Sequence, residues 1–399
     1  MTDVLEAAQS GDAGEIKAAL AEGGSPNVCD GMGTTPLMLA AMLCPDESAS
    51  AALIQAGAKI DAQQNSGMTA LFFAAAKARN AALIDLLLSK GANVNARDKK
   101  GITPLMFAAS LNHEPAVIET LLDAGAELNA RDKDGLSALL WAAKSNPNPA
   151  VAALLVNSGA DIRQREEKYG ATPLMTAAKE NPNPQMIAVL LTMGAKVNRA
   201  TVNGFTPLML AAGKNPNAAV VEALLAGGAD VSMKTLDGRT ALMFAAQSAR
   251  NPAVIDALLR YGAAVDDCDK RGATPLMIAA VENSNAAITE SLLKGGASLA
   301  VSDKVLNASP AMWAAAKNPN PQVLEALFKY GANPFETMAD GKTLLIAAAS
   351  SNDNPAVAGF LLEQGIDPKQ ADKYNATAAD YARNNPALFN TDVYWRLLG

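Results

Sequence analysis

Apolar and polar positions follow one pattern that returns many times along the chain. A Thr or Ser is followed by Pro or Ala, an apolar pair, one variable residue and Ala-Ala, as in TPLMFAA at 103–109. A second apolar stripe at helical spacing follows, formed in the same repeat by Val117, Ile118, Leu121 and Leu122. Since apolar residues at this spacing line one face of a helix, each repeat is predicted to hold two short helices and a polar arm.

The pattern returns at an almost constant interval. Its first residues are Thr35, Thr69, Thr103, Ser137, Thr172, Thr206, Thr240, Thr274, Ser309 and Thr343. They lie 34 or 35 residues apart, and a degenerate copy starts at Thr377. A period of this size is typical of a solenoid, in which each repeat packs on its neighbours instead of around one central core.

The repeat from 98 to 131 shows how the chain should fold locally. Thr103 is expected to cap the first helix, with Pro104 at its first position, where a missing N–H costs nothing. Pro115 opens the second helix, and Gly125 ends it in the left-handed conformation that glycine tolerates. The following polar segment is expected to form a hairpin-like arm, so the fold class is all-α with short β-hairpin-like arms.

A recurring Asn-Pro-Asn-Pro segment separates the two helices of many repeats. Its later asparagine precedes proline at Asn148, Asn183, Asn251, Asn320 and Asn354, and alanine at Asn80, Asn217 and Asn285. Asparagine accepts a hydrogen bond from the first turn of a helix, so the segment is interpreted mainly as a device that starts the second helix.

Helix, loop, helix and arm at this period, with TPLMxAA and GAxVNA, resemble the ankyrin repeat. The resemblance covers essentially all of residues 1–399 and implies one array. Residues 1–30 are similar to an N-terminal capping repeat, 31–369 to ten full repeats, and 370–399 to a C-terminal cap. The tetratricopeptide repeat has a similar period, but its tryptophan, glycine and tyrosine pattern is missing.

The repeats depart from the family pattern in two ways. Methionine takes the usual histidine position in most repeats, for example at Met106, and replaces a polar group with a flexible apolar side chain. Met together with NPNP resembles ankyrin arrays found in bacteria. The unit is also one residue longer than the common ankyrin unit, at the helix–helix loop. Apart from these departures, two arms are one residue longer than the others, with Glu167 and Lys304 placed at the usual Asp position and Asn307 in place of a turn glycine.

Composition and charge indicate in which cellular compartment the protein resides and which kinds of partner it binds. The net charge is −7, which argues against nucleic acid as a partner. Cys29, Cys44 and Cys268 are scattered and odd in number, as in proteins of a reducing compartment. The first residues lack the features of a secretory signal, and no apolar run approaches the roughly 18 residues of a membrane span. We therefore expect a cytoplasmic protein without membrane contact.

The sequence offers little chemistry for catalysis. His113 stands in a helix–helix loop without an evident partner, and the cysteines lack metal-ligand spacing. No glycine-rich phosphate loop is present. The alternative is a site concealed in the solenoid, with coupled acids in a deep pocket. We expect no enzyme, no cofactor and no metal.

The resemblance implies where a partner would bind. Ankyrin arrays bind partners on a concave face formed by the first helices and the arms, through variable positions after Ala-Ala and around the arm turn. The bases at these positions include Lys77, Lys144, Lys179, Lys214 and Lys317 on the helices and Arg97, Lys99, Lys100, Arg131 and Lys133 on the arms. Bases outnumber acids at these positions on an acidic protein, which predicts a basic groove that attracts an acidic protein segment. Surface lysines that only keep the array soluble are the alternative.

The variable residue of TPLMxAA forms a second candidate feature. It is aromatic at Phe73, Phe107, Trp141, Phe244 and Trp313, although only 5% of the chain is aromatic. Packing between neighbouring first helices explains these side chains, and so does a strip of binding anchors.

Two functions remain open at this stage. The first is a protein–protein interaction scaffold or adaptor, and the second is a dedicated inhibitor, such as an immunity or antitoxin-like protein that plugs a partner enzyme. In both cases a monomer and an unidentified, acidic protein partner are expected.

Overall fold

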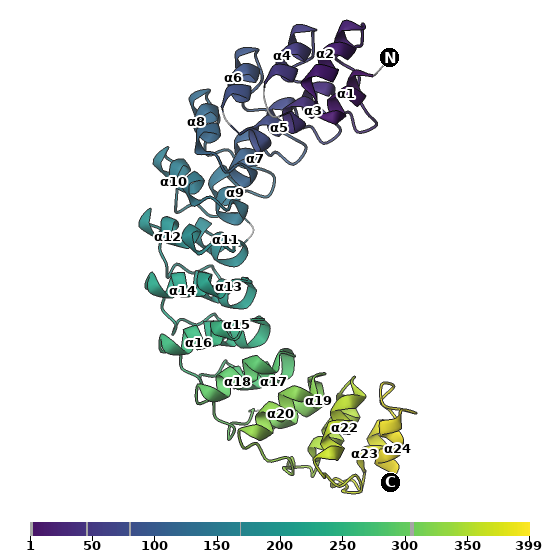
Figure 1. Cartoon of the computed structure of the whole chain (residues 1–399). Helices are drawn as coiled ribbons and strands as arrows, with labels where there is room; N and C mark the ends of the chain where they lie inside the picture. The colour runs from purple at the N-terminus through teal and green to yellow at the C-terminus, as the bar shows by residue number, and fades with distance from the viewer. Residues whose placement is uncertain (1–2, 45–46, 80, 168, 304–306) are drawn as a thin grey trace. The chain divides into compact units, whose positions relative to one another are not determined.

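The computed structural model describes residues 3–44, 47–79, 81–167, 169–303 and 307–399. Within them the chain forms two compact units, Met1–Val197 and Asn198–Gly399, called the N-terminal unit and the C-terminal unit below. Both units are built from pairs of short helices, as Figure 1 shows. The all-α fold class is therefore confirmed.

The helices of the N-terminal unit alternate between a first and a second helix of each repeat. The first helices are α1 (Val4–Ser10), α3 (Pro36–Leu43), α5 (Ala70–Lys77), α7 (Pro104–Leu111), α9 (Ala138–Ser145) and α11 (Pro173–Glu180). The second helices are α2 (Ala13–Ala21), α4 (Ser48–Gln55), α6 (Ala82–Ser89), α8 (Pro115–Asp123), α10 (Pro149–Asn157) and α12 (Pro184–Thr192).

The C-terminal unit repeats this arrangement. Its first helices are α13 (Pro207–Lys214), α15 (Ala241–Ser248), α17 (Pro275–Glu282), α19 (Pro310–Lys317), α21 (Leu344–Ser351) and α23 (Ala378–Ala382). Its second helices are α14 (Ala218–Ala226), α16 (Ala253–Arg260), α18 (Ala286–Lys294), α20 (Pro321–Lys329), α22 (Pro355–Glu363) and α24 (Asp392–Leu398).

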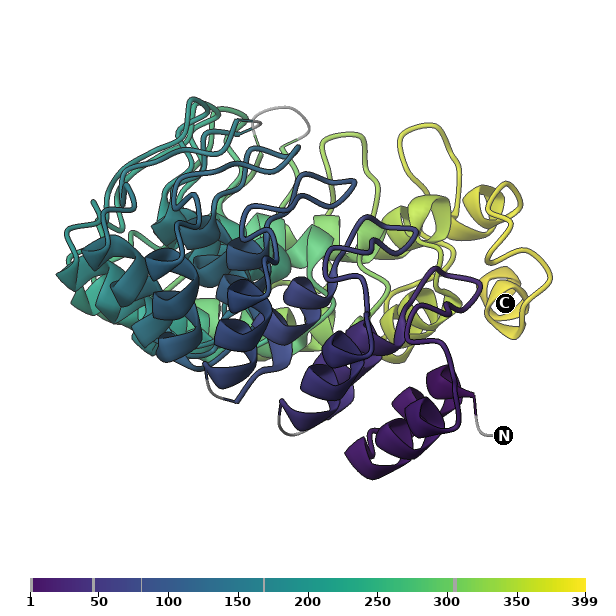
Figure 2. The same cartoon turned by 90° about the horizontal axis from the view of Figure 1, so that it is seen from above.

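Within each unit the helices stack in two layers. Consecutive first helices pack on one another, as α5 does on α3 and α7, and consecutive second helices pack in the same way. The arms project from one end of the helices, which Figure 2 shows from above. The core lies between the layers, where Ala108, Ala109 and Met106 are almost completely buried. Small alanines let neighbouring helices approach closely, and methionine fills the remaining space.

The first helices begin as the sequence predicts. In α7 the Thr103 hydroxyl accepts the Met106 N–H at 3.3 Å, and Pro104 occupies the first position. Thr69 is an exception, because its buried hydroxyl makes no hydrogen bond.

The second helices also begin at the predicted asparagines. Asn148 accepts the Ala150 N–H at 3.0 Å, and Asn183, Asn217, Asn285, Asn320 and Asn354 act in the same way. Asn251 accepts the N–H of Ala253, the first residue of α16, from one position before the N-cap residue Pro252. Asn80 lies outside the described residues.

The earlier asparagine of the same segment has a different role, which the sequence interpretation missed. Asn146 is fully buried, and its amide group donates to the carbonyls of Ala109 at 2.8 Å and Asn112 at 2.7 Å in the preceding repeat. Its own oxygen accepts the Asn148 N–H at 2.8 Å. Seven buried asparagines make both carbonyl contacts at equivalent positions of their repeats: Asn112, Asn146, Asn181, Asn283, Asn318, Asn352 and Asn385. We call this row the asparagine ladder.

The arms are hairpin-like turns. In one arm the Asp98 N–H donates to the Ile102 carbonyl at 3.0 Å, and the Lys99 N–H donates to Ser66 of the preceding arm at 2.8 Å. Gly204 shows why glycine closes these turns, because its φ is 84° and an added Cβ would lie 2.9 Å from Thr235 Cα of the next arm. Within the described residues the β contact of the arms is a single bridge between Thr337 and Thr343.

The placement of the extra arm residues corrects the sequence alignment. Glu166, not Glu167, occupies the usual Asp position, because its carboxylate accepts the Ala171 N–H at 3.3 Å. Asp303 holds the same position in the second long arm, where it accepts the Ala308 N–H at 2.9 Å. The extra residue therefore lies after this acid, inside the turn. Lys304 lies outside the described residues, and Asn307 has a φ of 53°, as expected for a substitute for glycine.

Candidate partner-binding surface

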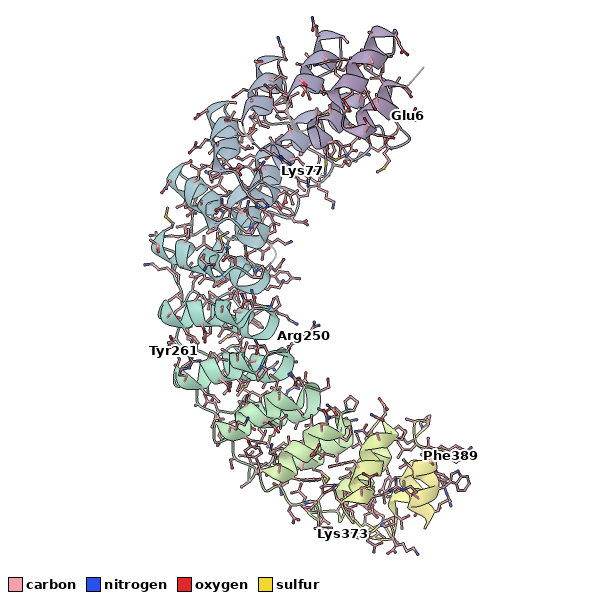
Figure 3. All side chains as sticks on the ribbon, in the orientation of Figure 1. Glu6, Lys77, Arg250, Tyr261, Lys373 and Phe389 are labelled. Atoms are coloured by element: carbon pink, nitrogen blue, oxygen red, sulfur yellow. The ribbon has the colours of Figure 1, made fainter. Side chains whose placement is uncertain are left out.

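The predicted lysines at the ends of the N-terminal unit's first helices differ in their surroundings. Lys77 is exposed at the end of α5 (Figure 3). Lys144 lies 5.2 Å from the centre of the Trp141 ring, and its amine is 3.5 Å from Glu180. Lys179 pairs with the same carboxylate at 3.0 Å. Glu180 thus offsets part of the charge of two candidate residues.

The candidate bases on the arms divide into two groups. Lys99, Lys100 and Lys133 are exposed. The guanidinium of Arg97 donates to the Arg131 carbonyl at 2.9 Å, and that of Arg131 donates to the Arg165 carbonyl, also at 2.9 Å. The two arginines therefore brace neighbouring arms, whereas the lysines present their charges to solvent.

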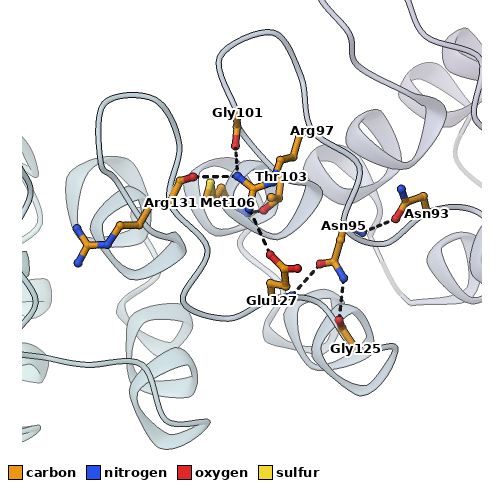
Figure 4. A network of polar contacts seen from close by, with 9 residues as sticks. All are labelled: Asn93, Asn95, Arg97, Gly101, Thr103, Met106, Gly125, Glu127 and Arg131. Atoms are coloured by element: carbon orange, nitrogen blue, oxygen red, sulfur yellow. Dashed lines mark hydrogen bonds and ion pairs between the residues drawn. The ribbon is translucent and has the colours of Figure 1, made fainter.

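Side-chain hydrogen bonds between repeats extend this bracing (Figure 4). Asn95 donates to the Gly125 carbonyl at 3.0 Å and accepts the Glu127 N–H at 2.8 Å. Arg97 pairs with the Glu127 carboxylate at 3.2 Å. These contacts hold the lysines of neighbouring arms at fixed spacing.

The aromatic candidates of the N-terminal unit make intramolecular contacts. Phe107 is half-buried, and its ring centre lies 6.0 Å from that of Phe72 in the preceding repeat. The indole N–H of Trp141 donates to Asp132 at 2.9 Å. Because Asp132 Oδ1 also accepts the N–H groups of Asp134 and Leu136, this bond ties the arm to helix α9.

The C-terminal unit repeats these themes with one variation. Lys214 and Lys317 are exposed at the ends of α13 and α19. Trp313 donates to Asp303 at 3.1 Å, as Trp141 does to Asp132. Packing and arm attachment thus account for the tryptophans, and contact of any candidate residue with a partner stays a prediction.

Phe244 has different neighbours. Its ring centre lies 5.3 Å from that of Phe205, and the Arg239 guanidinium lies 4.5 Å above its ring. The repeat pattern does not single out Phe205, because this residue directly precedes the capping threonine, where other repeats carry different side chains. Phe205 could have been found by asking which residues lie next to the aromatic position of the following repeat, Phe244.

The perturbed titratable groups of the last arms serve structure. The Tyr381 hydroxyl donates to Asp372 at 2.6 Å, which lowers the pKa of Asp372 and raises that of Tyr381. Lys342 pairs with Asp340 at 3.0 Å, and this contact raises the pKa of Lys342. The Asp372–Tyr381 bond joins an arm to helix α23.

Two features are absent from the part of the chain that the structure describes. Among these residues, no cluster of three or more His, Cys, Asp or Glu side chains could hold a metal ion. No described helix has the length and apolar character needed to cross a membrane.

The comparison with protein families agrees with the fold. The family model for ankyrin repeats, which holds three copies, matches residues 4–98, 75–166, 148–235, 208–303 and 311–393. The crystal structure of the human ASB11 ankyrin repeat domain is similar, with a TM-score of 0.49 and 23% identity over 58% of this chain and 99% of that chain. Among curated proteins no match was found.

Proposed function

Because the chain belongs to the ankyrin repeat family, whose arrays generally act as protein–protein interaction modules, we propose that it binds an acidic segment of another protein. The first helices and arms form the binding face in this proposal. The protein acts there as a scaffold or adaptor, through recognition and without catalysis.

The exposed arm lysines of the N-terminal unit carry the proposal. Lys99, Lys100 and Lys133 extend from arms that hydrogen bonds hold in register, and Lys77 is exposed on α5. The chain has a net charge of −7, so bases gathered on one face stand out from the remaining surface. A basic face on an acidic protein favours an acidic partner and disfavours general adhesion to polyanions.

Four further properties belong to the same proposal. Residues 1–399 act as one array, with 1–30 and 370–399 as caps, and the protein works as a cytoplasmic monomer. A one-to-one inhibitor of a partner enzyme is the alternative, and it would use the same face. Tight stoichiometric binding that abolishes an enzyme activity of the partner would favour the inhibitor.

Charge reversal tests the proposal. Lys99→Glu combined with Lys133→Glu changes only exposed side chains and leaves the backbone bonds of the arms in place. The tagged protein would be used to capture partners from cells, and the partner identified by mass spectrometry would then be titrated. We expect the reversal to weaken binding by about tenfold or more at low salt and much less at high salt, because screening removes the attraction.

The control reverses one lysine charge on the second-helix layer. Lys90→Glu at the end of α6 should leave binding unchanged. Equal binding by the Lys99→Glu/Lys133→Glu variant, with unchanged circular dichroism, would overturn the proposal.

A further inference from the structure

Arg239 of the C-terminal unit is held in place without a charge partner. Its guanidinium lies over the Phe244 ring and donates to Gln247 at 2.9 Å. Its Nε atom is buried and makes no hydrogen bond, and within the described part of the chain Arg239 forms no ion pair. Partly burying an uncompensated charge is costly, and an anion at the outer edge of the guanidinium would offset that cost.

A cation also lies over an aromatic ring in the N-terminal unit, and there it has the carboxylate partner that Arg239 lacks within the described residues. There Lys144 lies over Trp141 and pairs directly with Glu180 of the next repeat. In the C-terminal unit Glu282 occupies the position of Glu180, but Gln247 donates to it and stands between it and Arg239. The charge of Lys144 is therefore partly offset by an ion pair within the chain, whereas Arg239 has no such pair among the described residues.

The arms beside Arg239 also lack their usual carboxylates. Thr201 and Thr235 replace the turn aspartate of other arms. The Thr201 hydroxyl accepts the Phe205 N–H and the Thr235 hydroxyl accepts the Arg239 N–H, each at 3.1 Å. The turn geometry is kept while two negative charges are absent. The two substitutions make the potential around Arg239 more favourable to an anion.

Apolar side chains surround the same place. Phe205 and Phe244 form a half-buried ring pair next to Arg239. Val202 and Leu236 are 75% and 62% exposed at the tips of adjacent arms, which the Leu236 N–H joins to the Asn203 carbonyl at 3.1 Å. Neighbouring exposed apolar residues of this kind, next to an arginine, are typical of binding anchors.

A cavity of about 310 Å³ opens beside this cluster. Arg239, Lys270, Arg271 and Ile278 are among its lining residues. Asp237, Asp269 and Glu282 also line it, so three carboxylates stand beside three bases. Backbone N–H groups of its own turn hold Asp269, and Gln247 holds Glu282. The bases that face the cavity thus include groups that a bound carboxylate can approach.

We infer that this cavity binds an Asp or Glu side chain of a partner peptide, and that a neighbouring large apolar side chain of the peptide packs on Phe205 and Phe244. This inference rests on the proposed function and names the chemistry that the C-terminal unit would select. Arg239 recognises the carboxylate, Lys270 and Arg271 add attraction, and Val202 and Leu236 extend the apolar contact.

Selection from a random twelve-residue peptide library against the full-length chain tests the inference. We expect the selected peptides to be enriched in sequences that place Asp or Glu within three residues of a large apolar residue. The strongest of them, fluorescently labelled, is then titrated against variants of the full chain. Changing its acid to the amide, or its apolar residue to alanine, should each weaken binding about tenfold.

The variants follow from the contacts. Arg239→Gln should weaken binding of the labelled peptide by about tenfold or more. Thr235→Asp restores the carboxylate found in other arms, so it should keep the turn intact and still weaken binding several-fold. Arg260→Gln removes one positive charge from α16 in the second-helix layer and should have no effect. Thermal melts confirm that each variant folds.

Two results would overturn the inference. One is a selected set without the pairing of acid and apolar residue, and the other is unchanged binding by both Arg239→Gln and Thr235→Asp. If acidic peptides still bind and only the Lys99→Glu/Lys133→Glu variant weakens them, the proposed function stands without this cavity. If no acidic peptides are selected, both proposals fail.

Discussion

At the scale of the residue, one buried asparagine serves three backbone groups. The amide group of Asn146 donates to two carbonyls of the preceding repeat, and its oxygen accepts the N–H of Asn148. Pro147 follows Asn146, so the Ala143 carbonyl lacks an N–H four residues on, and Asn181 of the next repeat supplies the missing donor at 3.1 Å. Each ladder residue thus completes the end of a neighbouring helix.

Removing one ladder residue should be costly. Asn146→Ala leaves two buried carbonyls and one part-buried N–H without that partner, so we expect a loss of about 3 kcal/mol in the free energy of unfolding. Urea denaturation followed by circular dichroism measures it. The matched control is Asn148→Ser, which keeps an oxygen at the helix cap and should cost about 0.5 kcal/mol or less. Equal losses in the two variants would contradict the ladder's role.

The two asparagines also show how far local pattern carries. Asn148 could be predicted as a cap, because its partner lies two residues on in the chain. The partners of Asn146 lie 34 and 37 residues earlier, and no local pattern indicates which carbonyls the next repeat will bring there. For the same reason helices, caps and repeats were predictable, whereas the contacts of Lys144 and Arg239 across repeats were not.

A second prediction at this scale concerns pH. Burial raises the pKa of Glu336 above its ordinary 4.5, while a hydrogen bond from Ser309 opposes the shift. The folded state therefore holds this proton more tightly than the unfolded state. Stability contributed by the protonated group is full below pH 4.5 and is lost as pH rises through the folded pKa. Glu336→Gln should remove this dependence and melt at a higher temperature than the natural chain at pH 7.

The pH profile of the melting temperature checks this expectation. The variant and the natural chain should converge as pH approaches 4.5 and diverge above it. A constant difference at all pH values would show that the substitution acts through packing alone.

At the scale of the element, the arms depend on the first helices for their position. The turn acid of an arm accepts backbone N–H groups, and in two repeats it also accepts the indole N–H of a tryptophan in the following helix. Asp132 uses its second oxygen for the tryptophan, whereas Asp303 uses one oxygen for both. The sequence alignment missed the acid in both longer arms, because the extra residue could stand on either side of it. Only the hydrogen bonds of Glu166 and Asp303 decide its place.

Trp141→Phe tests the attachment of an arm. Phenylalanine keeps an aromatic ring on α9 but lacks the N–H that binds Asp132. We expect the free energy of unfolding to fall by about 1.5 kcal/mol, as for other hydrogen bonds to a charged group. Amide hydrogen exchange should become faster at 132–136 and stay unchanged in the arm at 98–102. Unchanged exchange at 132–136 would mean that the bond does not hold the arm.

At the scale of the whole molecule, charge separates two kinds of partner. The chain carries 40 acidic and 33 basic side chains, so a polyanion would meet net repulsion despite the exposed arm lysines. A protein segment can place a few carboxylates beside those lysines without extending over the acidic surface. The overall charge could be taken from the sequence, but the bracing that occupies Arg97 and Arg131 could not.

Binding to a phosphate-rich resin tests this distinction. We expect the full-length chain to pass through phosphocellulose at about 50 mM salt, where a protein that binds nucleic acid is normally retained. A basic nucleic-acid-binding protein in the same run serves as the positive control. Retention with a steep salt dependence would favour a nucleic-acid partner over an acidic protein.

The asparagine ladder has a consequence for how such an array can change length. Each asparagine of the ladder donates to two carbonyls of the preceding repeat and accepts one N–H of its own repeat. Because these three bonds are the same in each repeat of the ladder, a complete repeat can be duplicated or deleted and the new neighbours still fit. A change of one residue between two asparagines of the ladder alters the sequence separation between each asparagine and its carbonyl partners. Asn181 reaches carbonyls 35 and 38 residues back, one more than Asn146, because the added residue lies in the intervening arm. These bonds therefore favour growth by whole repeats, in evolution and in protein engineering alike, and the two one-residue insertions of this chain lie in arms.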